Sequence, residues 1–297
     1  MKFLVGKSAV ITGSGSGFGL ELARKAVSYG MNVVLVDINE NALVQAKQQI
    51  TEMGGTAITI KADVSKLEDM HNVAIKAKEA FGATTLLINN AGLGAGGLIW
   101  EINDRDWSRI MGVDFYGVLN GIRAFMPQML EAVEGDEDYC GYILNTASLA
   151  GFVSFPTMGP YNVAKSAVIS LSETLQADIG LVTDKIKVSV LAPGFVRTNI
   201  ANASIGTKGH DVEEPKHITA NHEMITNFVN GAKFVAEDIA NITFEKLLLG
   251  DFYIFSGDRE LESINALYKS MENGQYHNAL ENYDKKAYDL LKSKLKD

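Results

Sequence analysis

Short apolar runs alternate along the chain with longer segments in which apolar residues recur every three or four positions. The short runs predict buried strands, and the three-to-four spacing predicts amphipathic helices. Their alternation is typical of βαβ units with a parallel sheet covered on both faces. Strands are predicted at residues 8–12, 32–37, 56–61, 85–89, 142–146, 187–192 and 251–255. Helices are predicted at residues 19–29, 39–53, 66–81, 104–131, 159–180 and 237–248.

Two segments depart from this alternation. Residues 197–230 form a polar, irregular stretch that is too long for a plain connection, so we expect a lid over the substrate. From residue 259 to residue 297 the chain is charged, with apolar positions three and four apart. This spacing predicts an amphipathic helical tail that packs on the surface or against another subunit.

Composition and charge exclude several classes of protein. The net charge of −9 and the absence of a Lys/Arg cluster argue against nucleic acid as a partner. No run of 18 apolar residues is present, so we expect no membrane span. The single cysteine, Cys140, rules out an internal disulfide, and the five histidines are too scattered for a metal site. These features predict a cytoplasmic protein without a metal.

A glycine-rich segment, residues 12–19, connects the first predicted strand to the first predicted helix. Glycines there permit a tight turn and close approach to a pyrophosphate, and free N–H groups at the helix start favour negative charge. Asp37, at the end of the second strand, can accept hydrogen bonds from an adenosine ribose. Because a 2′-phosphate would meet like charge at Asp37, and no Lys or Arg lies nearby to neutralise it, we predict NAD rather than NADP.

At this point the sequence resembles the short-chain dehydrogenase/reductase family, in its shorter type with the motif Thr-Gly-x-x-x-Gly-x-Gly. Further motifs follow in the family's order: Asp63-Val64, Asn89-Asn90-Ala91-Gly92, Ser148, Tyr161-x-x-x-Lys165 and Pro193-Gly194-Phe195-Val196-Arg197-Thr198. The resemblance covers residues 8 to about 257. It implies a Rossmann-type, doubly wound, parallel seven-stranded sheet. The NAD-binding catalytic domain would span residues 1–258, with a C-terminal helical extension at residues 259–297.

The resemblance also implies which residues contact the cofactor. They are Gly13, Ser16, Gly17, Phe18, Gly19, Asp37, Ile38, Asp63, Val64, Asn90, Ala91, Gly92, Tyr161, Lys165, Pro193, Gly194, Val196 and Thr198. Relatives in the family are usually built from identical subunits. We therefore expect a homotetramer or homodimer.

Three residues are expected to carry the chemistry. Hydride transfer from an alcohol requires its oxygen to lose a proton, and a free phenol with a pKa near 10 is a poor base. Lys165 lies four residues after Tyr161 on the same helical face, where its ammonium favours the phenolate. The hydroxyl of Ser148, just past the fifth strand, can orient the substrate oxygen. We expect Tyr161 to be the acid and base of the reaction.

One position departs from the family pattern. Asp114 stands where the family commonly has an asparagine, in Met111-Gly112-Val113-Asp114. Its carboxylate could hold water for proton relay, but its charge would pair with Lys165 and weaken the pull of that ammonium on the phenol. Asp114 is therefore a candidate fourth catalytic residue, with a structural role as the alternative.

The substrate is indicated only by apolar segments near the expected cleft, residues 93–100 and 152–158. They suggest a bulky hydrophobic alcohol or ketone such as a hydroxysteroid. Two alternatives stay open: reduction of a carrier-bound 3-oxoacyl chain, and a regulator that senses NAD without turnover. The preference for NAD counts against the first, and the complete set of Ser148, Tyr161 and Lys165 counts against the second.

Overall fold

The computed structural model describes residues 4–94, 96–197 and 216–296. Its strands form one parallel sheet in the order β3-β2-β1-β4-β5-β6-β7. The strands are β1 (Ser8–Thr12), β2 (Asn32–Asp37), β3 (Ala57–Lys61), β4 (Thr84–Asn89), β5 (Gly141–Thr146), β6 (Ile186–Leu191) and β7 (Tyr253–Ile254). The prediction of a Rossmann-type, seven-stranded sheet in a single domain is confirmed.

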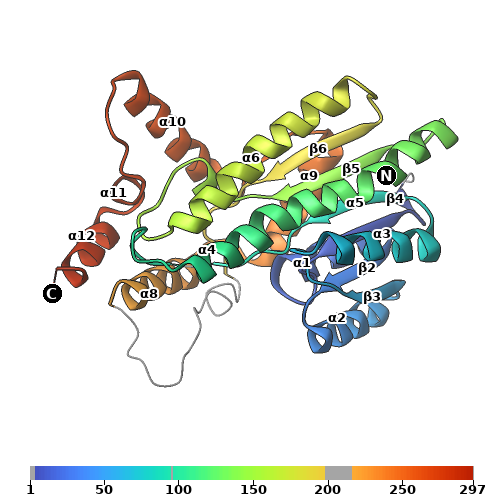
Figure 1. Cartoon of the computed structure of the whole chain (residues 1–297), viewed down its shortest axis with the longest axis horizontal. Coiled ribbons are helices and arrows are strands. Elements are labelled where there is room, and N and C mark those ends of the chain that lie inside the picture. The colour runs from blue at the N-terminus through green and yellow to red at the C-terminus, as the bar shows by residue number, and fades with distance from the viewer. Residues whose placement is uncertain (1–3, 95, 198–215, 297) are drawn as a thin grey trace.

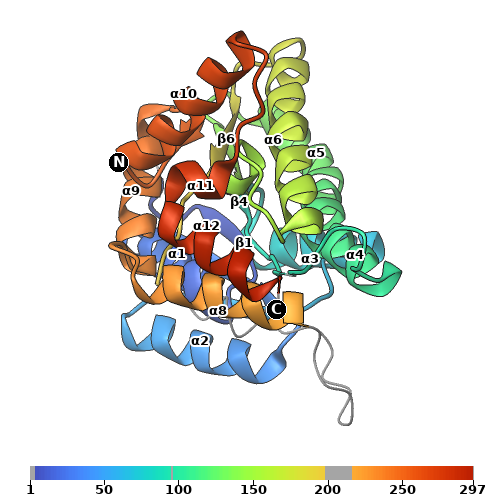
Figure 2. The ribbon, with the colours of Figure 1, turned by 90° about the vertical axis from the view of Figure 1, so that its left-hand side faces the viewer.

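Helices cover both faces of the sheet, as its buried strands require (Figures 1 and 2). One face packs against α3 (Leu67–Phe81), α5 (Gly117–Gly135) and α6 (Gly159–Gly180). The other face packs against α1 (Gly17–Ser28), α2 (Glu40–Glu52) and α9 (Ala236–Leu249). The sheet order reverses between β1 and β4, and sheets of this kind bind ligands beyond the strand ends at such a switch point.

The long helix predicted at residues 104–131 is interrupted in the structure. It consists of α4 (Asp104–Ile110), a π-helical turn η2 (Met111–Tyr116) and α5. A π turn accommodates one extra residue, and such turns are rare and occur frequently at functional sites. Here the turn carries the fully buried Asp114, whose side chain binds groups inside the protein. Apolar periodicity could not reveal this break.

The expectation of an irregular stretch at residues 197–230 is wrong in its second half. Residues Lys216–Asn230 form a regular helix, α8. Its buried positions follow helical spacing but include two polar side chains, His217 and Asn221, which masked the period in the sequence. Residues 198–215 of the expected lid lie outside the described residues.

The tail is divided into separate helices. It contains α10 (Asp258–Glu272), α11 (Ala279–Tyr283) and α12 (Lys285–Lys294). Gly274, with a φ of 65°, follows α10 and turns the chain back. Figure 2 shows α12 running beside α8, so that the tail packs on its own subunit over the carboxyl end of the sheet. Within the described residues, we find no helix with the length and apolar character needed to cross a membrane.

Candidate active site

A cavity of about 1130 Å³ opens at the carboxyl edge of the sheet. Nearly all the described residues predicted for the site line it. They are Gly13, Ser16, Gly17, Phe18, Asp37, Ile38, Asp63, Val64, Asn90, Ala91, Gly92, Asp114, Ser148, Tyr161, Lys165, Pro193, Gly194 and Val196. Gly19 lies behind the lining, and Thr198 falls outside the described residues.

The glycine loop has no room for a side chain at Gly13 or Gly19. A Cβ on Gly19 would lie 2.2 Å from the carbonyl oxygen of Gly13 and 2.8 Å from Asn90 Nδ2. Gly13 has a φ of 65°, and a Cβ there would lie 2.8 Å from Ala91 Cα. Helix α1 can therefore begin directly against the backbone of the loop. Its start lines the cavity through Ser16, Gly17 and Phe18, which fits a pyrophosphate held by N–H groups of the first helical turn.

Asp37 is fixed at the mouth of the same loop. Its Oδ2 accepts a hydrogen bond from Gly15 N at 3.0 Å, and its Oδ1 accepts one from Asn39 N at 2.9 Å. Each oxygen keeps a further lone pair for a donor in the cavity. The carboxylate is thus held in a position to accept hydrogen bonds from hydroxyl groups, and its charge would repel a phosphate.

Thr12 ties the glycine loop to the loop after β4. Its side-chain oxygen accepts hydrogen bonds from Asn90 N at 2.9 Å and Ala91 N at 3.1 Å. Its carbonyl accepts one from Asn90 Nδ2 at 3.0 Å. Thr12 was recognised only as part of a motif. Its position at the last residue of β1, where the sheet order reverses, is the signal that identifies it as a support of the site.

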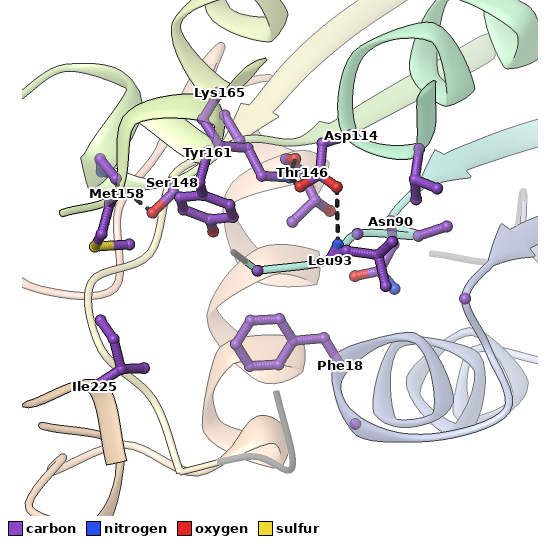
Figure 3. A pocket seen from close by; sticks show the side chains of 18 of the residues that line it. Phe18, Asn90, Leu93, Asp114, Thr146, Ser148, Met158, Tyr161, Lys165 and Ile225 are labelled. Carbon is purple, nitrogen blue, oxygen red and sulfur yellow. Dashed lines mark hydrogen bonds and ion pairs between the residues drawn. The ribbon is translucent and has the colours of Figure 1, made fainter. Parts of the chain in front are cut away.

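Lys165 lies at the centre of a buried polar group. Its Nζ donates to the carbonyl of Thr146 at 3.0 Å, lies 3.2 Å from Asp114 Oδ2 and is 5.5 Å from the ring centre of Tyr161. Asp114 Oδ1 accepts from Leu93 N at 2.8 Å. Figure 3 shows Tyr161 and Ser148 side by side, with the tyrosine hydroxyl directed into the cavity. The expected pairing of Asp114 with Lys165 is present.

The charges of this group oppose one another at Tyr161. Burial raises the pKa of the Tyr161 phenol, the Lys165 ammonium lowers it, the Asp114 carboxylate raises it, and a hydrogen bond from Ser148 lowers it. The net direction is upward, so Lys165 alone does not bring the phenol below its ordinary pKa. The ammonium of Lys165 favours the phenolate, as expected, but burial and the Asp114 charge outweigh it.

The neighbours of Tyr161 are also shifted. Burial raises the pKa of Asp114, and the charge of Lys165 only partly opposes this rise. Burial favours the neutral amine of Lys165, but the charges of Asp114 and Tyr161 outweigh it and raise the pKa of Lys165. Lys165 therefore stays an ammonium at neutral pH.

The end of the cavity beyond Tyr161 is mostly apolar. Phe155 and Met158 line it, as the apolar character of residues 152–158 indicated, whereas Trp100 points away and is 75% exposed. Sequence reasoning missed the contribution of α8. This helix supplies Ile218, Asn221, His222, Ile225 and Val229. Figure 3 shows Met158 and Ile225 lining the same part of the cavity.

A second missed residue comes from the tail. Glu260, on the first turn of α10 and 6% exposed, accepts hydrogen bonds from Gly194 N at 2.9 Å and from the Ser256 hydroxyl. Gly194 lines the cavity, so the tail supports the wall of the site from behind. Among the described residues, we find no group of three His, Cys, Asp or Glu side chains suited to a metal ion.

Known proteins resemble the chain over most of its length. The family model for short chain dehydrogenases matches residues 7–208. A crystal structure of a short chain dehydrogenase/reductase from Burkholderia phymatum in complex with NAD superimposes with a TM-score of 0.87. That protein is 37% identical, and the match covers 93% of this chain and 98% of the other.

Two further relatives are similar to this chain. The CLA biosynthesis dehydrogenase/reductase of Lactiplantibacillus plantarum is 31% identical over 265 residues, 86% of this chain and 90% of the relative. The 3beta-hydroxysteroid dehydrogenase 2 of Eggerthella lenta is 34% identical over 201 residues, 66% of this chain and 74% of the relative.

Proposed function

Because the chain belongs to the short-chain dehydrogenase family, it is an oxidoreductase that acts on CH–OH groups, and we propose that it uses NAD to interconvert a secondary alcohol and a ketone. The observation that carries the proposal is the convergence of Ser148, Tyr161 and Lys165 on the cavity that also contains the glycine loop. Ser148 follows β5 at the carboxyl edge of the sheet, and Tyr161 and Lys165 both lie on α6.

In this proposal Tyr161 moves the proton. Ser148 Oγ and Tyr161 Oη hold the substrate oxygen by hydrogen bonds, and the phenolate of Tyr161 accepts the alcohol proton as the carbonyl forms. In the reverse direction the phenol returns that proton to the carbonyl oxygen. Lys165 keeps its ammonium beside the ring and stabilises the phenolate.

The residues around the cavity fit a dinucleotide. The glycine loop and the start of α1 would hold the pyrophosphate, Asp37 the adenosine ribose, and Asp63 and Val64 the adenine. When bound, NAD supplies the nicotinamide carbon that takes the hydride from the alcohol. Lys165 would be assisted in favouring the phenolate by the positive charge that an oxidised nicotinamide would bring to the site. Asp37 supports NAD over NADP, because a 2′-phosphate bound beside its carboxylate would meet like charge.

Asp114 is proposed to set the charge balance of the site. It is completely buried in the π turn and lies against Lys165, so its carboxylate fixes the ammonium and opposes ionisation of Tyr161. The residue acts through Lys165 and does not touch the substrate. The consequence is a reaction whose pH dependence is governed partly by Asp114.

The proposed substrate is a secondary alcohol with an apolar body. Phe155, Met158, Phe195 and Ile225 supply apolar walls beyond the reacting atoms. A hydroxysteroid is one candidate of this kind, in agreement with the relative from Eggerthella lenta. Small polar alcohols would leave this surface in contact with water and bind weakly.

The family resemblance also supports a homodimer or homotetramer. Light scattering coupled to size exclusion chromatography would give the mass of the assembly directly. A mass of two or four times 32.2 kDa is expected, and a monomer would overturn this part of the proposal.

The activity is tested by nicotinamide absorbance with the purified protein, NAD or NADP, and a panel of hydroxysteroids, aryl secondary alcohols and short alcohols. Turnover with NAD and an apolar secondary alcohol is expected. Turnover with NADP alone would contradict the proposed role of Asp37. Binding of NAD with no turnover of any member would instead favour a regulator that senses the nucleotide.

A further inference from the structure

Three segments that are distant in the sequence meet at the substrate end of the cavity. Gly97, in the loop after β4, donates its N–H to the carbonyl of Thr157, in the segment before α6, at 2.8 Å. Asn221 Nδ2 on α8 donates to the same carbonyl at 3.0 Å and to Thr157 Oγ1 at 2.8 Å. His217 Nδ1, one turn earlier on α8, lies 2.5 Å from Glu101 Oε2. Helix α8 is thus joined to both loops.

Thr157 has an unusual backbone at this junction. Its φ is 61°, the one positive value among the described residues other than glycine. A β-branched residue rarely adopts this conformation, and it persists only where the surrounding contacts hold it. Here it directs both oxygens of Thr157 toward Asn221. Specific hydrogen bonds to Thr157 therefore hold this junction together.

Two glycines allow α8 to approach this closely. A Cβ on Gly96 would lie 1.8 Å from Asn221 Oδ1, and a Cβ on Gly97 would lie 3.0 Å from His217 Cδ2. Both polar side chains are deeply buried, with Asn221 6% and His217 8% exposed. The run of glycines after β4 thus has a structural reason, which is to seat the polar face of α8.

We propose that Asn221 and His217 are positioning residues, and that their attachment of α8 to the two loops sets the size of substrate that the site accepts. His217, Asn221 and Ile225 follow one another at intervals of four residues and so lie along one face of the helix. When His217 and Asn221 are fixed, Ile225 is held at the substrate end of the cavity, where Met158 also lies (Figure 3). The part concerning substrate size rests on the proposed function.

Amide hydrogen exchange tests the attachment without any substrate. Asn221→Asp keeps the shape of the side chain but replaces the donor of both hydrogen bonds by an acceptor facing the carbonyl of Thr157. Exchange at residues 216–230 is expected to rise by about tenfold, with α1 unchanged. Asn230→Asp, the same change at an exposed position of α8, is the control. Unchanged exchange in Asn221→Asp would overturn the proposal.

Glu101→Gln provides a second variant, because Glu101 is 42% exposed by its side chain and its replacement should not prevent folding. It is expected to raise exchange in the same segment, and no rise would contradict the role of His217.

Steady-state kinetics then tests substrate size. Asn221→Asp should raise KM for a bulky apolar alcohol by about tenfold and KM for a short alcohol by much less, with KM for NAD changed less than about twofold. An equal change in KM for the two alcohols, or no change in either, would overturn the claim about size. Absence of turnover in the unmodified protein, with exchange as expected, would count only against the proposed function.

Discussion

Asp114 Oδ2 lies 3.2 Å from Lys165 Nζ, and the two side chains are 0% and 4% exposed. A carboxylate and an ammonium thus form a buried ion pair, and its ammonium lies 5.5 Å from the ring centre of Tyr161. Burial makes such a pair sensitive to the loss of either partner, because the remaining charge is left without compensation. The pair links the sequence departure at position 114 to the proton chemistry proposed for Tyr161.

Asp114→Asn should move the pH profile of alcohol oxidation to lower pH. Oxidation requires the Tyr161 phenolate, so the rate rises as pH passes through the pKa of Tyr161. Burial raises that pKa and the Asp114 charge raises it further, so removing the charge lowers it. The midpoint of kcat against pH is expected to fall by roughly one unit. Asp104→Asn, an exposed position on α4, should leave it in place. A midpoint that stays or rises would speak against this role.

Asp37→Asn should weaken the preference for NAD. The change keeps one oxygen to accept the N–H of Gly15 but removes the charge that would repel a 2′-phosphate. The ratio of kcat/KM for NAD to that for NADP is expected to fall by about tenfold or more, as for removal of a like-charge contact. Glu40→Gln, a loss of the same charge just outside the cavity lining, serves as the control. An unchanged ratio would show that selectivity lies elsewhere.

Glu260→Ala should weaken NADH binding through the loop that carries Gly194. The variant leaves the N–H of Gly194 without its carboxylate partner, a loss that corresponds to about tenfold in affinity. Glu260→Gln keeps an acceptor and should restore most of the affinity. Fluorescence titration with NADH measures both, with the exposed Glu262→Ala on the same helix for comparison. If Glu260→Ala binds NADH as tightly as the unmodified protein does, this role of Glu260 is contradicted.

Ser172→Ala should reduce the free energy of unfolding. Ser172 Oγ accepts from Asn145 Nδ2 at 2.9 Å, and Asn145 Oδ1 accepts from Asn89 Nδ2 at 2.9 Å, in a fully buried chain between β4, β5 and α6. Removing the hydroxyl leaves the buried Nδ2 group of Asn145 without this acceptor, at a cost of about 1–3 kcal/mol. Urea unfolding measures the change, and Ser170→Ala on the exposed face of α6 should have almost no effect. Similar losses in both variants would argue against the network.

Much of this molecule follows from local sequence patterns. The apolar runs predicted the strands, because a parallel sheet buried on both faces needs continuous apolar residues. The glycine loop was identifiable because Gly13 and Gly19 have no room for a side chain. The strands and the glycine loop each depend on residues that are close in sequence, and each has a single physical requirement.

Other features depend on contacts between distant segments. The π turn exists around Asp114, whose partners Leu93 and Lys165 lie far away in the sequence. Helix α8 buries Asn221 because a strained Thr157 offers it two acceptors. Polarity at residues 216–230 suggested an irregular stretch, and apolar periodicity at residues 104–131 suggested an unbroken helix; only the tertiary contacts reverse these expectations. Residues such as Glu260 were missed for the same reason.

Tyr161→Phe tests the central claim most directly. The variant removes only the hydroxyl that is proposed to carry the proton, while the ring beside Lys165 stays in place. We expect kcat for alcohol oxidation with NAD to fall by at least about a hundredfold, within the range for loss of a general base, with NADH affinity nearly unchanged. Tyr116→Phe, at an exposed tyrosine of η2, should keep full activity. A Tyr161→Phe enzyme that retains most of its kcat would contradict the account.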